Sequence, residues 1–460
     1  MEHSNPFEII SPGSEWFATE SSEGMDRFGH GRDGACDETR QGNWYGGNVY
    51  FQDRYLTDEQ RMMRDTSRRY VDQVVIPFIR ADRTREWQMD PSDLLASHVL
   101  EQADAAGLRA LGVPDRFGGI ALDPLTQSQT LAVIATELAR GDSGLADKLV
   151  QNWKISVLIA QFAPEHLQEY WFTRYIAEPQ FLMAHCLTEP RGASDRWLPY
   201  NVPEANMDTK AVLEGDQWVI NGRKQFISNG YDASLYVVYA NTDDAVGMQQ
   251  GTSSFLVPRD APGLEVTRCN ETIGGRFMNN GEIAFDDCRV PADHLLVLND
   301  ALGKAGIYFR PGKVLVAAKS LGIGRGAYEE TVAFVHERVQ GGKVLIKHQA
   351  VAQRIADMAT RLEAVAALLR HAALAVDELS PDADTLCNMV KVFASHEIVK
   401  VCQNAMELHG GYGAMLEVGI EKYMRDALIN LHSDGTTDVS NFKIVRAMFP
   451  ETAGRYAGSE

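Results

Sequence analysis

The sequence predicts a multidomain α+β protein in which a helical region, a β region and a second helical region follow one another. Amphipathic segments of helical length dominate residues 56–182. Between 183 and 298 the segments are short, are rich in β-branched and aromatic residues, and are bounded by Gly, Pro and Asp. Long helical periods return after residue 299. With 460 residues, the chain has room for about two to four domains.

The first 55 residues form an N-terminal extension. They are rich in Gly, Ser and acidic residues and show neither a helical nor a strand period. Such a composition buries too little apolar area to offset the entropy lost on ordering, so we expect a flexible segment. The predicted domains are therefore the extension at 1–55, a helical domain at 56–182, a β-domain at 183–298 and a helical domain at 299–460.

Local signals predict the ends of several elements. Thr57 can cap a helix whose first turn carries Asp58 and Glu59. In the β region, WVINGRKQFIS (218–228) is predicted to form two short strands around Asn221-Gly222, because Asn-Gly is a strong hairpin signal. Further strands are expected at 235–241, 253–258 and 281–287.

Two long helices are predicted near the C-terminus. In the first, apolar residues step by threes and fours without interruption, at Val351, Ile355, Met358, Leu362, Val365, Leu369, Ala373 and Val376. The second follows Ser380-Pro381 and ends at Gly410-Gly411, where glycine can adopt a left-handed conformation.

Charge and composition exclude several classes of function. The chain has 44 basic and 63 acidic residues, a formal net charge of −19, so we expect no binding to nucleic acid. No apolar run is long enough to span a bilayer, and the start lacks the features of a signal peptide, which predicts a cytoplasmic protein without a membrane segment. The six scattered cysteines fit a reducing compartment, and no histidine spacing suggests a metal site.

Four polar segments are unremarkable when each is taken alone: LTEPRGASD (187–195), KQFISNG (224–230), HGGYG (409–413) and SDGTTD (433–438). Each can be a turn or a helix end. Their order and separation within a helical–β–helical frame are far more specific. Together with FDDCRVPADHLL (285–296) and the stretch that begins at ERVQGG (337–342), they resemble the acyl-CoA dehydrogenase family of flavoproteins over roughly residues 56–450. This resemblance implies a four-helix bundle in the C-terminal domain.

The resemblance also implies FAD as the cofactor and gives residues of the β-domain their roles. Leu187 and Thr188 match residues that meet the pyrimidine edge of the flavin. Phe226 matches the aromatic residue beside the isoalloxazine, and Ser228 matches a hydroxyl near flavin N5. Ser194 matches the serine near the pyrophosphate and is expected to contact the substrate as well. Hydrogen-bond donors at the pyrimidine edge would stabilise negative charge on the flavin.

A second set of matches concerns the adenosine pyrophosphate of FAD. Arg338 and Gln349 match residues that reach it across a subunit boundary, and Gly410 and Gly411 match the partner loop where the backbone approaches the same phosphate. The implied assembly is a homotetramer, a dimer of dimers. The expected cofactor contacts also include Glu407, Thr436 and Asp438.

Three departures from the family pattern affect this cofactor site. Arg191 replaces a loop glycine, Gln340-Gly341 replaces the frequent Thr-Phe, and Glu407 replaces a glutamine. They concern the affinity for FAD and not the identity of the cofactor.

The catalytic base is the decisive departure. The family commonly has a Glu before Gly-Thr, and here Asp434 precedes Gly435 and Thr436. A minority of relatives place a Glu on an earlier helix, and at that position this chain has Gly312, followed by Lys313. Because Gly312 has no side chain, Asp434 is the candidate base.

Two further expectations follow from this assignment, and one competing interpretation stays open. Exclusion of water should raise the pKa of the Asp434 carboxyl towards neutrality. Lys313 and Gly435 are expected to contact the substrate. The competing interpretation of Asp434 is that it only caps the following turn.

The predicted reaction is the α,β-dehydrogenation of an acyl-CoA thioester. Asp434 would remove the α-proton while the β-hydrogen leaves as hydride to flavin N5, and an electron-transfer flavoprotein would accept the electrons. Aspartate is shorter than glutamate by about 1.5 Å. Relatives that dehydrogenate cyclohexane-type rings also carry Asp here, so a branched, alicyclic or otherwise bulky acyl group is expected.

Two alternatives stay open. One is a flavin oxidase similar to nitroalkane oxidase, which also uses Asp but has an arginine seven residues later, where this chain has Asn441. The other is a non-catalytic protein that binds flavin or CoA on the same scaffold.

Overall fold

The computed structural model describes residues 51–88, 96–194 and 202–450. The predicted flexible extension therefore lies outside the described residues except for its last five positions. These form a short 3-10 helix, η3 (Phe51–Tyr55).

The N-terminal helical region begins at the predicted cap. The Thr57 hydroxyl accepts a hydrogen bond from the backbone N–H of Gln60 at 3.2 Å, and the Gln60 side chain accepts one from the backbone N–H of Thr57 at 3.1 Å. This reciprocal capping box fixes the start of α1. The helices of the region are α1 (Asp58–Tyr70), the π-helical turn η4 (Val71–Val75), α2 (Ile76–Ala81), α3 (Arg85–Gln88), α4 (Ser97–Ala105), η6 (Asp115–Phe117), α5 (Gln127–Gly141), α6 (Ser143–Phe162) and α7 (Glu165–Ala177).

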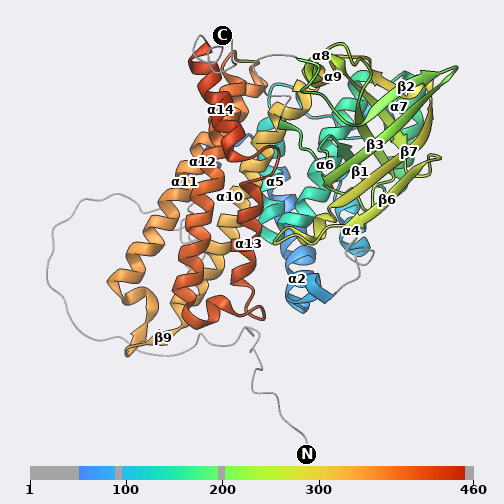
Figure 1. Cartoon of the computed structure of the whole chain (residues 1–460). Helices are drawn as coiled ribbons and strands as arrows, with labels where there is room; N and C mark the ends of the chain where they lie inside the picture. Colours follow the sequence, from blue (N-terminus) through green and yellow to red (C-terminus); the bar gives the residue numbers. More distant parts are fainter. Residues whose placement is uncertain (1–50, 89–95, 195–201, 451–460) are drawn as a thin grey trace, which may run out of the picture. The chain divides into compact units, whose positions relative to one another are not determined.

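The middle region is an eight-stranded sheet, drawn in green to yellow in Figure 1. Its order is β6-β7-β3-β2-β4-β5-β8, and β1 pairs in parallel with β4. The predicted strands at 235–241, 253–258 and 281–287 are confirmed as β4, β5 and β7. The strands are β1 (Met183–Cys186), β2 (Lys210–Glu214), β3 (Gln217–Ile227), β4 (Leu235–Asn241), β5 (Thr252–Pro258), β6 (Leu264–Cys269), β7 (Gly281–Pro291) and β8 (Leu295–Val297). Short helices α8 (Met248–Gly251), η8 (Arg276–Met278) and η9 (Ala292–His294) connect them.

The predicted hairpin at Asn221-Gly222 is wrong. Strand β3 runs without a break through both residues, and its pairing with β7 shifts register between Ile220 and Gly222. The Asn221 side chain donates to the Asp287 carboxylate at 3.0 Å and accepts from the Asp287 backbone N–H at 2.8 Å. A Cβ on Gly222 would lie 2.6 Å from the Cα of Thr209, so only glycine fits. The Asn-Gly pair therefore builds a bulge within one strand instead of a turn between two.

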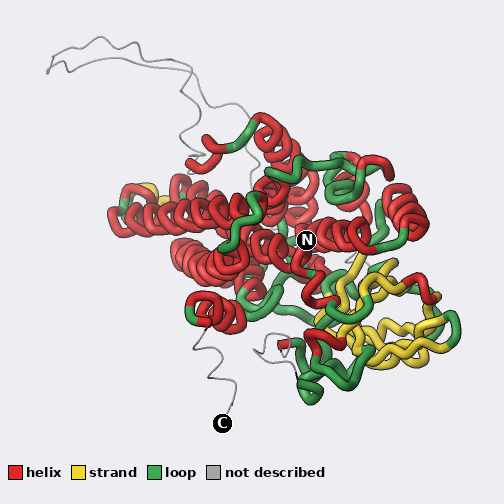
Figure 2. The backbone as a smooth tube through the Cα atoms, turned by 90° about the horizontal axis from the view of Figure 1, so that it is seen from above, coloured by secondary structure: helices red, strands yellow, loops and turns green. Residues whose placement is uncertain are grey.

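The C-terminal region is helical. The two predicted long helices are confirmed as α11 (Gln349–Asp377) and α12 (Ala383–His409). They pack with α10 (Gly306–Glu337) and α13 (Ile420–Asn430), as Figure 1 shows in orange to red. The remaining elements are α9 (Ala301–Lys304), the small ribbon of β9 (Val339–Gln340) and β10 (Lys343–Val344), η10 (Leu345–Lys347), η11 (Gly410–Ala414) and α14 (Thr437–Met448). Figure 2 shows the strands of the eight-stranded sheet gathered apart from these helices.

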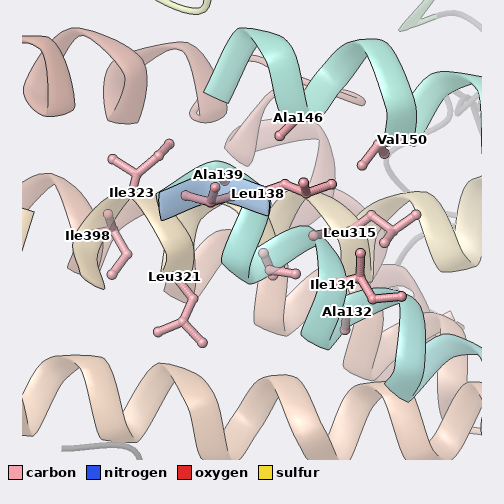
Figure 3. Close-up of a cluster of buried hydrophobic side chains, with 14 of the residues drawn as sticks. Ala132, Ile134, Leu138, Ala139, Ala146, Val150, Leu315, Leu321, Ile323 and Ile398 are labelled. Atoms are coloured by element: carbon pink, nitrogen blue, oxygen red, sulfur yellow. The ribbon is translucent and has the colours of Figure 1, made fainter. Parts of the chain in front are cut away.

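Helix α10 packs against α5 of the N-terminal region and against α11 and α12 of its own region through one shared core. Leu138 of α5, Leu321 of α10 and Ile398 of α12 belong to one cluster of buried side chains (Figure 3). A Cβ on Gly322 would lie 2.2 Å from the carbonyl oxygen of Thr136, so α10 and α5 are in backbone contact there. Each fully buried Leu or Ile contributes about 1.5–3 kcal/mol to the stability of such a core. The core therefore fixes the helices that carry the candidate active site.

Two global properties follow from the described residues. Among them, no helix combines the length and apolar character that are needed to cross a membrane. The cysteines in this part of the chain, at positions 186, 269, 288, 387 and 402, are free thiols.

Candidate active site

Asp434 lies in the loop between α13 and α14, and its carboxylate does not cap the helix that follows. The cap of α14 is Thr436, whose hydroxyl accepts a hydrogen bond from the backbone N–H of Val439 at 3.2 Å. Asp434 and Gly435 both have positive φ, +49° and +94°. This uncommon backbone turns the Asp434 side chain away from the helix start and back towards α6 and α10.

The two positions at which the family is expected to carry a base meet in space. Gly312 is on α10, and a Cβ added to it would lie 3.2 Å from Oδ2 of Asp434. The space that a side chain at 312 would occupy is therefore next to the Asp434 carboxylate. Lys154 of α6 borders the same space, with its Cδ atom 3.5 Å from that Cβ position.

Buried lysines surround Asp434, and we call Lys154, Lys313, Lys319 and Lys391 the lysine cluster. Their exposed fractions are 5%, 2%, 2% and 0%. Lys154 Nζ lies 3.0 Å from Asp434 Oδ2, and Lys313 Nζ donates to the Asp434 carbonyl at 3.3 Å. Lys391 Nζ donates to the Leu431 carbonyl at 3.0 Å.

A second carboxylate, that of Asp147, lies near the lysine cluster. Lys319 of α10 forms a close ion pair with Asp147 of α6. Lys154 also lies over the ring of Tyr308, with its Nζ 4.7 Å from the ring centroid. Two ion pairs, Lys154–Asp434 and Lys319–Asp147, therefore join α6, α10 and the loop of Asp434.

The expected rise in the pKa of Asp434 is wrong. Desolvation by burial does act to raise this pKa, but the charges of Lys154, Lys319 and Lys313 outweigh it and lower the pKa below its usual value. The same cluster acts on Lys391, whose pKa is lowered to about 7 by burial and by the neighbouring charge of Lys313. The expectation rested on desolvation alone, because Lys154 and Lys319 stand in no recognisable motif and Lys313 was expected to contact the substrate, not the base.

The candidate flavin residues of the β-domain come together at the end of β3. The Thr188 carbonyl accepts from the Gln225 backbone N–H at 2.9 Å. Beneath this contact, Lys224 and Glu189 form a buried ion pair at 2.8 Å, and Lys224 also donates to the Leu187 carbonyl at 3.3 Å. The loop that carries Leu187 and Thr188 is therefore tied to the strand that leads to Phe226 and Ser228.

Phe226 and Ser228 lie at this strand end. Phe226 has a φ of +59° and is 60% exposed, although the neighbouring Ile227 is buried in the sheet. The Ser228 hydroxyl donates to Sδ of Met278 at 3.0 Å. Ser194 is exposed in the loop after Arg191, and the next motif residue, Asp195, lies outside the described residues.

Three of the residues that were assigned to the adenosine pyrophosphate, Arg338, Gly410 and Gly411, line a groove of about 530 Å³. Glu407, a further expected cofactor contact, lines the same groove. Nothing lies within 4 Å of a Cβ position on either glycine, so the backbone there is open to a ligand. Gln349 begins α11 but is not among the residues that line the groove.

The groove has a positive residue beside an aromatic ring and a carboxylate that is already paired. The Arg338 guanidinium lies 5.5 Å from the centroid of the Tyr412 ring. Glu407 accepts hydrogen bonds from Gln403 at 3.0 Å and from Arg354 at 2.6 Å. These two bonds lower the pKa of Glu407 and occupy its carboxylate.

Most of the predicted residues thus fall into three groups in the structure, and Gln349 and Ser194 lie outside them. One group lines the groove, and a second lies at the end of β3. The third surrounds Asp434 and includes Gly435, Lys313 and Thr436, with exposed Asp438 in the first turn of α14. Sequence reasoning missed Lys154, Lys319, Lys391 and Asp147. The available signal was a lysine within an apolar helical run, such as NWKISVLIA (152–160).

Comparison with known proteins agrees with this arrangement. The models of the N-terminal, middle and C-terminal domains of acyl-CoA dehydrogenases match residues 57–178, 184–288 and 307–449. A cyclohex-1-ene-1-carbonyl-CoA dehydrogenase of Geobacter metallireducens is 32% identical over 400 residues, 86% of this chain and 100% of the relative. The chain belongs to the acyl-CoA dehydrogenase family. It therefore belongs to a family of oxidoreductases that act on CoA thioesters.

Two solved structures share the fold of this acyl-CoA dehydrogenase family member. Butyryl-CoA dehydrogenase from Megasphaera elsdenii is 26% identical, with a TM-score of 0.76 over 85% of this chain and 98% of the other. A chain from a study of the electron transferring flavoprotein of Acidaminococcus fermentans is 31% identical, with a TM-score of 0.76 over 86% of this chain and 98% of the other. The predicted α+β fold with its helical, β and helical domains is confirmed.

Proposed function

We propose that this protein is an FAD-dependent acyl-CoA dehydrogenase in which Asp434 removes the α-proton of the substrate. The observation that carries the proposal is the placement of the Asp434 carboxylate. It points to the space beside Gly312, and Thr436 takes over the capping of α14. A carboxylate that has no capping role and faces the second base position of the family is suited to proton transfer.

The described residues fit FAD. Arg338 and the open backbone of Gly410 and Gly411 would hold the pyrophosphate in the groove, and the exposed ring of Phe226 would contact the isoalloxazine. Glu407 does not oppose this, because Arg354 pairs with its carboxylate. FAD, when bound, supplies the acceptor for the hydride that leaves the β-carbon of the substrate.

The protein's own residues would carry out the proton transfer. Asp434 Oδ2 accepts the α-proton as the double bond forms between the α- and β-carbons. Lys154 holds this carboxylate at 3.0 Å, and Lys313 holds the backbone of the same residue through its carbonyl. The α-proton becomes acidic only when the thioester carbonyl accepts hydrogen bonds. A backbone N–H group at the base position would be one of the donors.

Substrate, partners and assembly complete the proposal. A branched or alicyclic acyl group suits the short base, and the Geobacter relative is named for a cyclohexene-carbonyl thioester. An electron-transfer flavoprotein is the proposed acceptor. The proposed assembly is a homotetramer, in which a second chain would meet the open groove that contains Arg338.

Anaerobic reduction of the flavin tests the function. Purified protein should be yellow with one FAD per chain, and cyclohexanecarboxyl-CoA should bleach it faster than butyryl-CoA. The Asp434→Asn variant should keep FAD and bind ligand but lose turnover by orders of magnitude. Full activity of this variant would contradict the role of Asp434. Hydrogen peroxide release in air would favour the oxidase, and no bleaching by any acyl-CoA would favour a binding protein.

A further inference from the structure

The lysine cluster is larger than the proposed reaction requires. Its four ammonium groups come from α6, α10 and α12, and each lysine is at most 5% exposed. Lysine is almost never fully buried in folded proteins unless it is paired. A base needs at most one neighbour to orient it, so the cluster calls for a separate explanation.

The charges around the base do not balance. Lys154 and Lys319 each contact one carboxylate, Asp434 and Asp147 respectively. Lys391 donates instead to a backbone carbonyl, that of Leu431. These three lysines and two carboxylates carry one more positive than negative charge when all five groups are ionised. Burial and the charge of Lys313 lower the pKa of Lys391 to about 7 against the charges of Asp434 and Asp438, so Lys391 is only partly charged near neutral pH, and an anion beside it would restore its proton.

We propose that the acyl group of the substrate carries its own carboxylate, or another anion of like charge, and that the lysine cluster binds it. This inference rests on the proposed function, because it concerns the acyl part of the same substrate. The anion would satisfy buried positive charge that the two ion pairs leave in excess. A charge-assisted hydrogen bond to the anion would offset part of the cost of burying these ammonium groups.

The distances limit how far this anion lies from the reacting carbon. Lys154 Nζ is 3.0 Å from Asp434 Oδ2. A base within about 3–3.5 Å of the α-carbon places that carbon within about 6.5 Å of Nζ. A carboxylate oxygen at hydrogen-bond distance from Nζ, about 3 Å, then lies at most about 9.5 Å from the α-carbon, a span that about six C–C bonds of about 1.5 Å cover. The substrate class is therefore the CoA monothioester of a short or cyclic dicarboxylic acid.

The substrate anion would also act on the base. Lys154 is the ion-pair partner of Asp434 in the absence of substrate. An anion that draws the Lys154 ammonium towards itself loosens this pair and makes the carboxylate a stronger proton acceptor. Binding of the correct acyl group and activation of the base are thereby the same event.

Matched substrates test the inference on the unmodified holoenzyme. Glutaryl-CoA is compared with the CoA thioester of glutaric acid monoamide, and cyclohexane-1,2-dicarboxylic acid mono-CoA thioester with cyclohexanecarboxyl-CoA. We expect kcat/KM, measured with an artificial electron acceptor, to be about 10- to 100-fold higher for the charged member, the range that one charge-assisted hydrogen bond supplies. Equal or higher kcat/KM for the neutral members would overturn the inference and leave the dehydrogenase function standing. No oxidation of any of the four thioesters would instead count against the proposed function.

A variant at the lysine that carries the excess charge tests where the anion binds. Lys391→Met removes this charge, because Lys391 donates to the Leu431 carbonyl and forms neither of the two ion pairs. It should reduce the preference for the charged substrate at least fivefold. Lys210→Met is the matched control, because Lys210 is exposed on β2 and pairs with Asp244 at 2.8 Å. A preference that survives in Lys391→Met, with flavin content and thermal stability intact, would contradict binding at the cluster. If Lys391→Met does not fold, the substrate comparison on the unmodified enzyme decides alone.

Discussion

At the scale of single residues, the protonation state of Asp434 determines when the site can act as a base. Its pKa is lowered because three lysine charges outweigh the effect of burial. A carboxyl with a lowered pKa stays ionised as the pH falls, so kcat/KM should show no loss from Asp434 between about pH 9 and about pH 5. The pH profile of kcat/KM checks this, because it reports groups of the free enzyme.

Lys154→Met tests whether the neighbouring lysine charge lowers the pKa of Asp434. This variant removes the positive charge nearest to Asp434, so the pKa of the carboxyl should rise and a decline of kcat/KM at acidic pH should appear. An unchanged acidic limb in the variant would show that Lys154 does not hold the carboxylate in solution.

Lys391 gives a prediction for stability. Its pKa is lowered to about 7, so the folded state loses this proton before the unfolded state does. The unfolded state then binds more protons, and the free energy of unfolding should rise with pH from about 7 towards about 10, by at most about 1.4 kcal/mol per pH unit. Urea unfolding of the wild type and of Lys391→Met across this range measures the effect. The variant should lack this component of the rise, and parallel pH dependences would contradict the prediction.

At the scale of elements, the bulge in β3 determines how the strand reaches the candidate flavin residues. Gly222→Ala puts a Cβ at 2.6 Å from the Cα of Thr209 and at a φ of +149°. It should destabilise the protein by roughly 1–3 kcal/mol. Gly215→Ala is the control, because Gly215 also has positive φ, +64°, but has nothing within 4 Å of its Cβ position. Urea unfolding should show a smaller loss of about 1 kcal/mol for Gly215→Ala, and equal losses would contradict the close-contact argument.

The same strand shows what local sequence can and cannot predict. The Thr57 cap, strand β4 and the helix α11 depend on neighbours in the chain, and these predictions are confirmed. The Asn221-Gly222 prediction failed because the pairing of Asn221 with Asp287, which is 66 residues away, decides between bulge and turn. Tertiary contacts overrule turn propensity at such positions.

At the scale of the whole molecule, the groove with Arg338 is where the proposed cofactor site and the proposed subunit interface coincide. Arg338→Ala should lower the FAD content of the purified protein and shift the proposed tetramer towards smaller species, because one residue would serve a cofactor shared by two chains. Arg174→Ala is the control, since Arg174 is a surface residue paired with Glu178. Flavin absorbance per chain and light scattering are the measurements. Full FAD content in Arg338→Ala would contradict the assignment of the groove.

The candidate site was only partly predictable from the sequence, because some of its residues come together only in the folded molecule. Asp434, Arg338 and the glycine pair stand in motifs, and the resemblance identified them. Lys154 and Lys319 stand in helices where a lysine is ordinarily part of a solvated face. Their burial arises only when α6, α10 and the loop before α14 converge, and one sequence does not show that convergence.

The contact between Gly312 and Asp434 has a consequence for which element can supply the proposed base. Two positions far apart in the chain open onto one point, since a Cβ at 312 would be 3.2 Å from the Asp434 carboxylate. A carboxylate introduced on α10 at position 312 would therefore lie at the same point as the carboxylate in the loop. The proposed base could then be supplied from either element without a change of fold.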